Sequence, residues 1–311
     1  MPLDAGARPV SGGFWSLSVT TNLTLHQQKE SNMKTPSRLR LQTQVPNVTD
    51  GFDHLIFWFD RPELPFDTDQ LKSHCGDLNR IERQPKFHAN RKLSLSLFQP
   101  TQKCLILLGE LVGREMVVDV TYAEVARDVL VRNVTAATSM MDAFLAAVFI
   151  PYSHHTFTRY QDTWYCGPPT KKGSRMVLYP DRPSKINNAR PLDDDDPDFH
   201  FEWRASGKDA LAQIGIASID DLIMFDHDRH WAERIRLYDI TNKTELGRML
   251  AKCMGGKANA SNPAYLKRGN KWIDDHTEDG NFVMHNALKS TPYLQSLLTT
   301  ISWSQWLQDQ P

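Results

Sequence analysis

The hydrophobic and polar positions of the hexapeptide FHFEWR at residues 199–204 alternate, and this pattern is the most informative in the chain. Successive side chains of a β-strand point to opposite faces of the sheet. The alternation therefore predicts a strand with an aromatic face of Phe199, Phe201 and Trp203 and a polar face of His200, Glu202 and Arg204. An imidazole, a carboxylate and a guanidinium on one face suit a divalent metal and a phosphate. The alternative is an ordinary amphipathic strand whose polar face is solvated.

Further apolar runs predict the neighbouring elements. The run DHLIFWFD at 53–60 is followed by Arg-Pro and predicts a buried strand. LSLSLFQ at 93–99 alternates strictly, and together with CLILLGEL at 104–111 it predicts a hairpin. TWYCG at 163–167 and RMVLY at 175–179 predict two strands that are separated by a turn rich in Pro, Gly and Lys.

The helical predictions fall around and after these strands. Residues 116–130 begin as a strand, and a helix is expected either from near Thr121 or through 136–148. Ser218 with Asp221 three positions later predicts a capping box that opens a helix. The remaining C-terminal predictions are a helix at 228–240, a loop at 255–280 and two short helices near 292–306.

These patterns predict an α+β fold in which an antiparallel sheet is flanked by helices and followed by a helical C-terminal region. Residues 1–50 are rich in Ser, Thr, Gln and Pro, and we expect a loosely ordered N-terminal arm in which Met1 and Met33 are both candidate starts. The α+β domain is expected at 51–216 and the helical region at 217–311.

Composition narrows the classes of function. The chain has 311 residues, 40% of them hydrophobic, and a formal net charge of −1. A protein that coats nucleic acid is usually basic, so contact with DNA is expected only through local patches. Four scattered cysteines without a CxxC pair argue against a zinc ribbon or a disulfide scaffold. The absence of a membrane-spanning apolar run leads us to expect a soluble cytoplasmic protein.

Tyr179 is a candidate nucleophile. It ends an apolar strand and is followed by a segment that contains Asp181, Arg182 and Lys185. A phenol can attack a DNA phosphate and hold the strand as a phosphotyrosine ester, which divides one difficult step into two. Nearby cations or a metal would take up charge on the phosphate. The alternative is a tyrosine that ends a strand in a proline turn.

Two further sets of polar residues are candidates for the same site. Glu124 and Asp128 are four positions apart, so they share a face on either a helix or a strand and could lend a carboxylate to a metal. Solvated surface charges are the alternative. The candidate DNA-binding cations are Lys171, Lys172, Arg175 and Arg204.

In this order, the pieces YAEVARD, TWYCG with the following SR, RMVLYPDRPSK and FHFEWR resemble motifs of rolling-circle replication initiators of small plasmids and filamentous phages. Those HUH-like endonucleases carry an acidic pair, a T-x-Y-x-G-x-R hairpin, an R-x-Y-x-K tyrosine segment and an R-F-E-type strand. The matching residues are Glu124 and Asp128 for the acidic pair, Tyr179 for the nucleophile, Lys185 or Arg182 for its basic neighbour, and Glu202 for the strand carboxylate.

The resemblance implies a Rep nuclease-like fold and a replication initiation protein of a plasmid or phage. Such an endonuclease nicks and rejoins single-stranded or hairpin origin DNA through a phosphotyrosine intermediate and leaves a 3′-hydroxyl that primes synthesis. The expected cofactor is Mg²⁺ or Mn²⁺, held by His200 and Glu202 with Glu124 or Asp128. Host replication proteins are candidate partners, and no membrane partner is expected.

Two other functions remain open at this point. A non-catalytic DNA-binding replication or partition protein would keep the sheet without the chemistry, and the prolines after Tyr179 favour it. A metal-dependent nuclease would attack with water in place of tyrosine and would leave no protein–DNA adduct.

Overall fold

The computed structural model of the chain describes residues 41–42, 48–82, 88–131, 133–168, 172–180, 198–239, 263–308 and 310. Most of the predicted N-terminal arm lies outside the described residues. No helix in the described part of the chain is long and apolar enough to span a bilayer.

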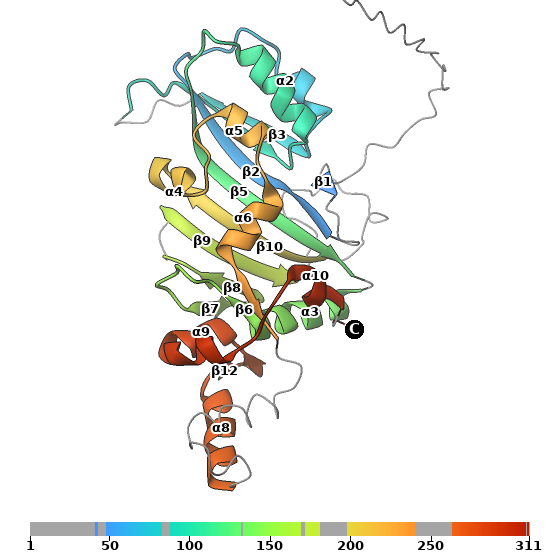
Figure 1. Cartoon of the computed structure of the whole chain (residues 1–311). Coiled ribbons are helices and arrows are strands. Elements are labelled where there is room, and N and C mark those ends of the chain that lie inside the picture. Colours follow the sequence, from blue (N-terminus) through green and yellow to red (C-terminus); the bar gives the residue numbers. More distant parts are fainter. Residues whose placement is uncertain are drawn as a thin grey trace, which may run out of the picture. The chain divides into compact units, whose positions relative to one another are not determined.

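One antiparallel sheet organises the described residues (Figure 1). Its strands follow the order β3-β4-β2-β5-β10-β9-β8-β7, and β1 pairs with β2 beside this path. In that order the strands are β3 (Asp77–Glu82), β4 (Leu93–Phe98), β2 (Val48–Phe59), β5 (Val118–Leu130), β10 (Asp198–Ser206), β9 (Gly173–Pro180), β8 (Thr163–Cys166) and β7 (Phe157–Tyr160), with β1 at Leu41–Gln42. The predicted α+β class with a large antiparallel sheet is confirmed.

Helices pack on the apolar face of this sheet, and Figure 1 shows α4, α5 and α6 lying across it. The aromatic face of β10 is buried there, and the Phe201 ring stacks on Phe144 and meets Trp231 edge-on. The helices on this side are α1 (Asp69–Lys72), α2 (Gln102–Val112), α3 (Val134–Ala147), α4 (Lys208–Gln213), α5 (Ile219–Ile223), α6 (His227–Arg234) and α10 (Trp303–Gln308).

The C-terminal region contains helices, as predicted, together with short strands. A three-stranded sheet joins β14 to β11 and β11 to β6, so this region pairs with a strand that directly follows α3. These elements are β6 (Val148–Phe149), β11 (Arg236–Tyr238), β12 (Thr277–Glu278), β13 (Asn281–Phe282), β14 (Thr300–Ile301), α8 (Pro263–Asp275), α9 (Met284–Ser290) and the 3₁₀ helix η2 (Pro292–Leu297).

The predicted hairpin at 93–111 is wrong in its second half. Residues 93–98 form β4, but Gln102–Val112 is helix α2. Thr101 caps this helix, since its hydroxyl accepts a hydrogen bond of 3.0 Å from the Cys104 amide. A short continuous apolar run does not distinguish a buried strand from a buried helix by its periodicity. The leucine-rich composition and the threonine cap favour the helix.

Four other predictions are resolved, corrected or confirmed. Strand β5 continues through Leu130, so the helix begins after it at Val134 and not near Thr121. The helix predicted at 228–240 ends at Arg234 and gives way to strand β11. Helix α8 occupies 263–275 within the predicted loop. The predicted capping box is confirmed, because the Ser218 hydroxyl accepts from the Asp221 amide and the Asp221 carboxylate accepts from the Ser218 amide.

A buried ion cluster ties the sheet to its helices. The side chain of Arg127 on β5 is 3% exposed, and it donates two hydrogen bonds of 2.7 Å to the Asp50 carboxylate on β2. A third hydrogen bond of 2.7 Å reaches Asp228 on α6. The guanidinium also lies 5.1 Å from the ring centroid of Trp303 on α10. One cation therefore holds two strands and two helices together on the apolar face.

His285 makes the stability of the fold sensitive to acid. Its Nδ1 accepts a hydrogen bond from the Ile150 amide, and its Nε2 donates one to the His155 carbonyl. Both hydrogen bonds are compatible only with the neutral ring, because a protonated Nδ1 cannot accept. Burial lowers the pKa of His285 from 6.5 to about 4. His285 therefore binds a proton more readily in the unfolded chain than in the folded one. The stabilisation of the fold by neutral His285 is complete above pH 6.5 and is lost as the pH falls towards 4.

We therefore expect the free energy of unfolding to decrease from pH 6.5 to 4, with His285 contributing up to about 3 kcal/mol of the loss. Urea unfolding at several pH values measures it. His285→Gln should unfold more easily at neutral pH and show a shallower pH dependence, whereas a change of the exposed His88 to Gln should leave the slope unaltered. An equally steep slope in His285→Gln would contradict this role.

Candidate metal centre and phenol site

The opposite face of the sheet carries a row of polar side chains. His200, Glu202 and Arg204 of β10 lie on this face, across from Asp128 and Glu124 of β5. Both His200 and Glu202 are buried, with 4% and 0% of their surfaces exposed. The alternative of a solvated polar face is therefore wrong for these two residues. Buried charged groups are expensive unless they are paired or bind a metal, so this row needs an explanation.

A β-bulge adds a carboxylate to the row. In the pairing of β2 with β5, Phe52 lies opposite Val125 while His54 lies opposite Glu124, so Asp53 is an extra residue in β2. A bulge changes the direction in which a side chain points and often occurs next to functional sites. Asp53 thereby turns to the polar face, although Phe52 beside it packs in the apolar core.

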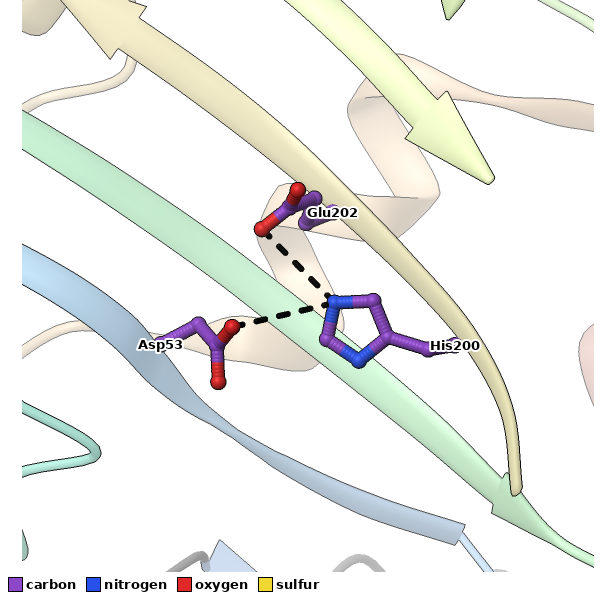
Figure 2. A group of neighbouring side chains, drawn as sticks. All are labelled: Asp53, His200 and Glu202. Carbon is purple, nitrogen blue, oxygen red and sulfur yellow. Dashed lines mark ion pairs between the residues drawn. The ribbon is translucent and has the colours of Figure 1, made fainter. Parts of the chain in front are cut away.

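Asp53, His200 and Glu202 bring three ligand-type atoms together across three strands. Figure 2 shows Asp53 reaching from β2 across β5 towards the ring of His200, with Glu202 beside it on β10. His200 Nε2 lies 3.6 Å from Glu202 Oε2 and 4.0 Å from Asp53 Oδ2. The three ligand atoms lie within 4.8 Å of one another, and all three residues are buried.

Each member of this triad is held by a neighbour through its other polar atom. Asp128 Oδ1 lies 2.5 Å from His200 Nδ1, which fixes the proton on that nitrogen and leaves Nε2 as the acceptor. Arg204 Nε donates to Glu202 Oε1 at 2.7 Å. Gln99 donates to Asp53 Oδ1 at 3.2 Å. The second atom of each ligand faces the common space.

The triad has the properties of a divalent metal site. Among the described residues, His200 Nε2 and Glu202 Oε2 are buried and have no hydrogen-bond partner. Ligand atoms about 2.1 Å from one ion lie about 3.0–4.2 Å apart, which matches the two separations. Burial would raise the pKa of Glu202, but Arg204 and His200 outweigh it and hold that pKa below its usual value, so the carboxylate is ionised. Two carboxylates and one imidazole suit Mn²⁺ or Mg²⁺.

Tyr179 lies against this triad. It pairs with His200 in the register of β9 and β10, and its ring stacks on the imidazole with centroids 4.5 Å apart. Burial raises the pKa of Tyr179 well above its usual value, and the charges of Glu202 and Asp53 raise it further. The Tyr179 side chain is half-buried. Its raised pKa keeps the phenol protonated, and the charges of the same carboxylates contribute to this effect.

A second phenol lies at the other end of the polar row. The Tyr122 hydroxyl donates to Glu124 Oε1, and Arg204 Nε lies 3.2 Å from the same carboxylate oxygen. Burial and the charge of Glu202 raise the pKa of Glu124 well above its usual value. Glu124 and Asp128 thus both contact residues of the polar row. Glu124 contacts Tyr122 and Arg204, and Asp128 contacts His200.

An open groove of about 1070 Å³ adjoins the row at Tyr122, His54 and Arg204. Trp58 gives it a further aromatic surface, and its walls are more basic than acidic. Among the described residues, the cations that line it are Arg91, Lys172, Arg175, Arg204 and Lys208, and the lining carboxylate is Asp209. Arg91 is paired with Asp119 at 3.1 Å.

The glycine of the TWYCG motif positions one of these cations. Gly167 has a φ of +151°, and a Cβ at this position would lie 2.3 Å from the Cβ of Arg175. Only glycine therefore lets the end of β8 approach β9 so closely. The Arg175 guanidinium lies 5.7 Å from the ring centroid of Tyr165 on β8, which orients it along the polar face.

The structure brings most of the predicted site residues to one face. Tyr179, His200, Glu202, Glu124, Asp128 and Arg204 lie along the polar row, and Lys172 and Arg175 line the adjoining groove. Lys171, Arg182 and Lys185 lie outside the described residues. Sequence reasoning missed Asp53, Gln99 and Tyr122. A bulge has no clear sequence signal, but Tyr122 is two positions before Glu124 and shares its face in a continuous strand.

No protein-family model matches the chain, and no curated protein sequence matches it. Among solved structures, the chain is similar to a rolling circle replication initiator protein from Geobacillus stearothermophilus. The alignment covers 72% of this chain and 96% of that chain, with 10% sequence identity and a TM-score of 0.32. At this level the likeness assigns neither a family nor an activity, and the site itself has to support any function.

Proposed function

We propose that the protein is a replication initiation protein that nicks and rejoins single-stranded origin DNA through a covalent phosphotyrosine intermediate. The observation that carries the proposal is the convergence of Tyr179 with a buried, metal-suited triad. Its ring stacks on His200, whose free nitrogen faces Glu202 and Asp53. A phenol beside such a triad has what phosphoryl transfer needs, namely a nucleophile and a means of charge stabilisation.

Each residue has a definite task in this proposal. Tyr179 attacks the scissile phosphorus, and the broken P–O3′ bond leaves a 3′-hydroxyl. Asp53, His200 and Glu202 would hold a Mn²⁺ or Mg²⁺ ion, which would supply Lewis-acid polarisation of the phosphate and offset the carboxylate charges around the phenol. Asp128, Arg204 and Gln99 position the ligands. Rejoining is the reverse reaction, in which a 3′-hydroxyl attacks the phosphotyrosine.

The groove supports single-stranded DNA as the substrate. Its cations suit phosphates, and the half-buried rings of Trp58 and Tyr122 that line it suit unstacked bases. Lys172 and Lys208 are exposed, and Arg175 is partly buried. A net charge of −1 makes such local contacts necessary, since the chain as a whole does not attract DNA.

Incubation with random-sequence single strands and Mn²⁺ tests the activity. We expect a protein–DNA adduct that survives denaturation and is absent when EDTA replaces Mn²⁺. Sequencing the captured strands identifies the preferred site. Stoichiometric binding without cleavage, unaffected by EDTA, would instead support the non-catalytic DNA-binding protein.

The metal-dependent nuclease that uses water is the second candidate. The raised pKa of Tyr179 favours it, because a phenol that keeps its proton is a weak nucleophile. Cleavage products without any covalent protein would support this candidate and exclude the phosphotyrosine intermediate.

Asp128 provides a prediction for the metal centre. Asp128→Asn removes the carboxylate behind His200 Nδ1 and is expected to weaken Mn²⁺ binding by about 10- to 100-fold, because this contact orients the ring and strengthens Nε2 as a ligand. Isothermal titration calorimetry measures the affinity. Asp119→Asn, at a half-exposed position in the groove region, is the matched control and should bind Mn²⁺ as the wild type does. Equal affinities in both variants would contradict the proposed centre.

A further inference from the structure

Tyr122 has the surroundings of an acid–base group, and neither the candidate nucleophile nor the metal triad uses it. Its hydroxyl donates to Glu124, and its ring meets His54 edge-on with centroids 5.2 Å apart. Thr121 before it is an extra residue in β5, so a second bulge lies directly beside it. Unlike the buried triad, Tyr122 lines the open groove and is accessible to a strand lying there.

Glu124 and Arg204 connect this phenol to the triad. Arg204 Nε lies 3.2 Å from Glu124 Oε1 and donates to Glu202 Oε1 at 2.7 Å. One guanidinium therefore bridges the carboxylate that holds Tyr122 and a carboxylate of the triad. A phosphate beside Arg204 would lie close to the Tyr122 hydroxyl and to the space between His200 and Glu202.

Tyr122 and Tyr179 approach this row from its two ends. Tyr179 pairs with His200, whereas Tyr122 pairs with Ser206, six positions further along β10. Glu202 and Arg204 lie between them. In-line displacement at phosphorus needs the nucleophile on one side and the leaving oxygen on the other. With Tyr179 as the nucleophile, a phosphate bound between them would have its leaving oxygen on the side of Tyr122.

The hydrogen bond of Tyr122 also suits this position. Its hydroxyl donates to Glu124, so the phenol carries a proton, as a general acid must. A leaving 3′-oxygen needs a proton because an alkoxide is a poor leaving group in water.

We infer that Tyr122 is the general acid that protonates the 3′-oxygen when the strand is cut, an inference that rests on the proposed nicking function. Tyr179 Oη forms a bond to phosphorus and releases its proton to solvent. The P–O3′ bond breaks, and O3′ takes the proton of Tyr122 Oη. Tyr122 regains a proton from solvent by way of Glu124, so no net proton is gained or lost. Glu124 and Arg204 are positioning residues in this step.

A sulfur-substituted substrate separates this role from a structural one. The substrate is the single strand captured by the wild type, prepared with either oxygen or sulfur at the bridging 3′ position. A thiol has a pKa of about 8.5, so the 3′-sulfur can leave as a thiolate without taking up a proton. Tyr122→Phe is expected to form adduct about 10²- to 10⁴-fold more slowly than wild type on the oxygen strand and at the wild-type rate on the sulfur strand.

Two variants complete the design. Tyr160→Phe, at an exposed tyrosine on edge strand β7, should behave as wild type on both strands. Tyr179→Phe should form no adduct with either strand. A Tyr122→Phe protein that is slowed equally on both strands, or on neither, would overturn the general-acid role. A wild type that captures no single strand from the random pool would overturn the nicking function itself.

Discussion

Tyr179→Phe is expected to abolish covalent attachment to single-stranded DNA, a loss of at least about 10⁴-fold in the rate of adduct formation. The substitution removes only the hydroxyl, and the phenylalanine ring can keep its stack on His200. Denaturing gel electrophoresis of labelled strands measures the adduct. Peptide mapping of the wild-type adduct should place the DNA on Tyr179.

Metal binding is the control for this variant. Because none of the triad is altered, Tyr179→Phe should bind Mn²⁺ with the wild-type affinity. Adduct formation that survives the substitution would exclude Tyr179 as the nucleophile. Strand cutting that survives without an adduct would instead show that water attacks at this centre.

Arg127→Met is expected to lower the free energy of unfolding by about 3–5 kcal/mol. The substitution leaves the Asp50 carboxylate, 2% exposed, without its cation on the apolar face of the sheet. Trp303 also loses the guanidinium above its ring. Urea unfolding at pH 7 measures the effect, which should appear in the midpoint and not in the slope.

Asp228→Asn is the matched control for the ion cluster. Asp228 bonds to the same guanidinium at 2.7 Å, but its side chain is 67% exposed. We expect this variant to lose less than about 1 kcal/mol. Replacing both Asp50 and Arg127 by apolar residues should restore much of the stability lost in Arg127→Met, because no unpaired charge then remains buried. Equal losses in Arg127→Met and Asp228→Asn would contradict the account.

The parts of the fold that the sequence predicts are those with a strict period. FHFEWR alternates between aromatic and polar side chains, and β10 has this arrangement with its aromatic face in the core. His200 and Glu202 on its polar face are buried as well, which a two-residue period does not reveal. The run CLILLGEL has no period that separates strand from helix, and helix α8 lies in a segment whose glycine and asparagine content favours a loop.

The candidate site is only partly predictable for a different reason. His200, Glu202 and Tyr179 could be placed on one face from strand alternation and the expected order of motifs. Asp53 could not, because strict alternation from Leu55 and Phe57 would bury it in the apolar core. The bulge between Phe52 and His54 reverses its direction. Long-range pairings, such as that of Gln99 with Asp53, depend on the order of strands in the sheet.

The most direct measurement is the position of Mn²⁺ in crystals of the protein, located by its anomalous scattering. The account predicts one ion between Asp53 Oδ2, His200 Nε2 and Glu202 Oε2, with Tyr179 beside it. An ion bound elsewhere, or an empty triad at a Mn²⁺ concentration that supports cutting, would contradict it.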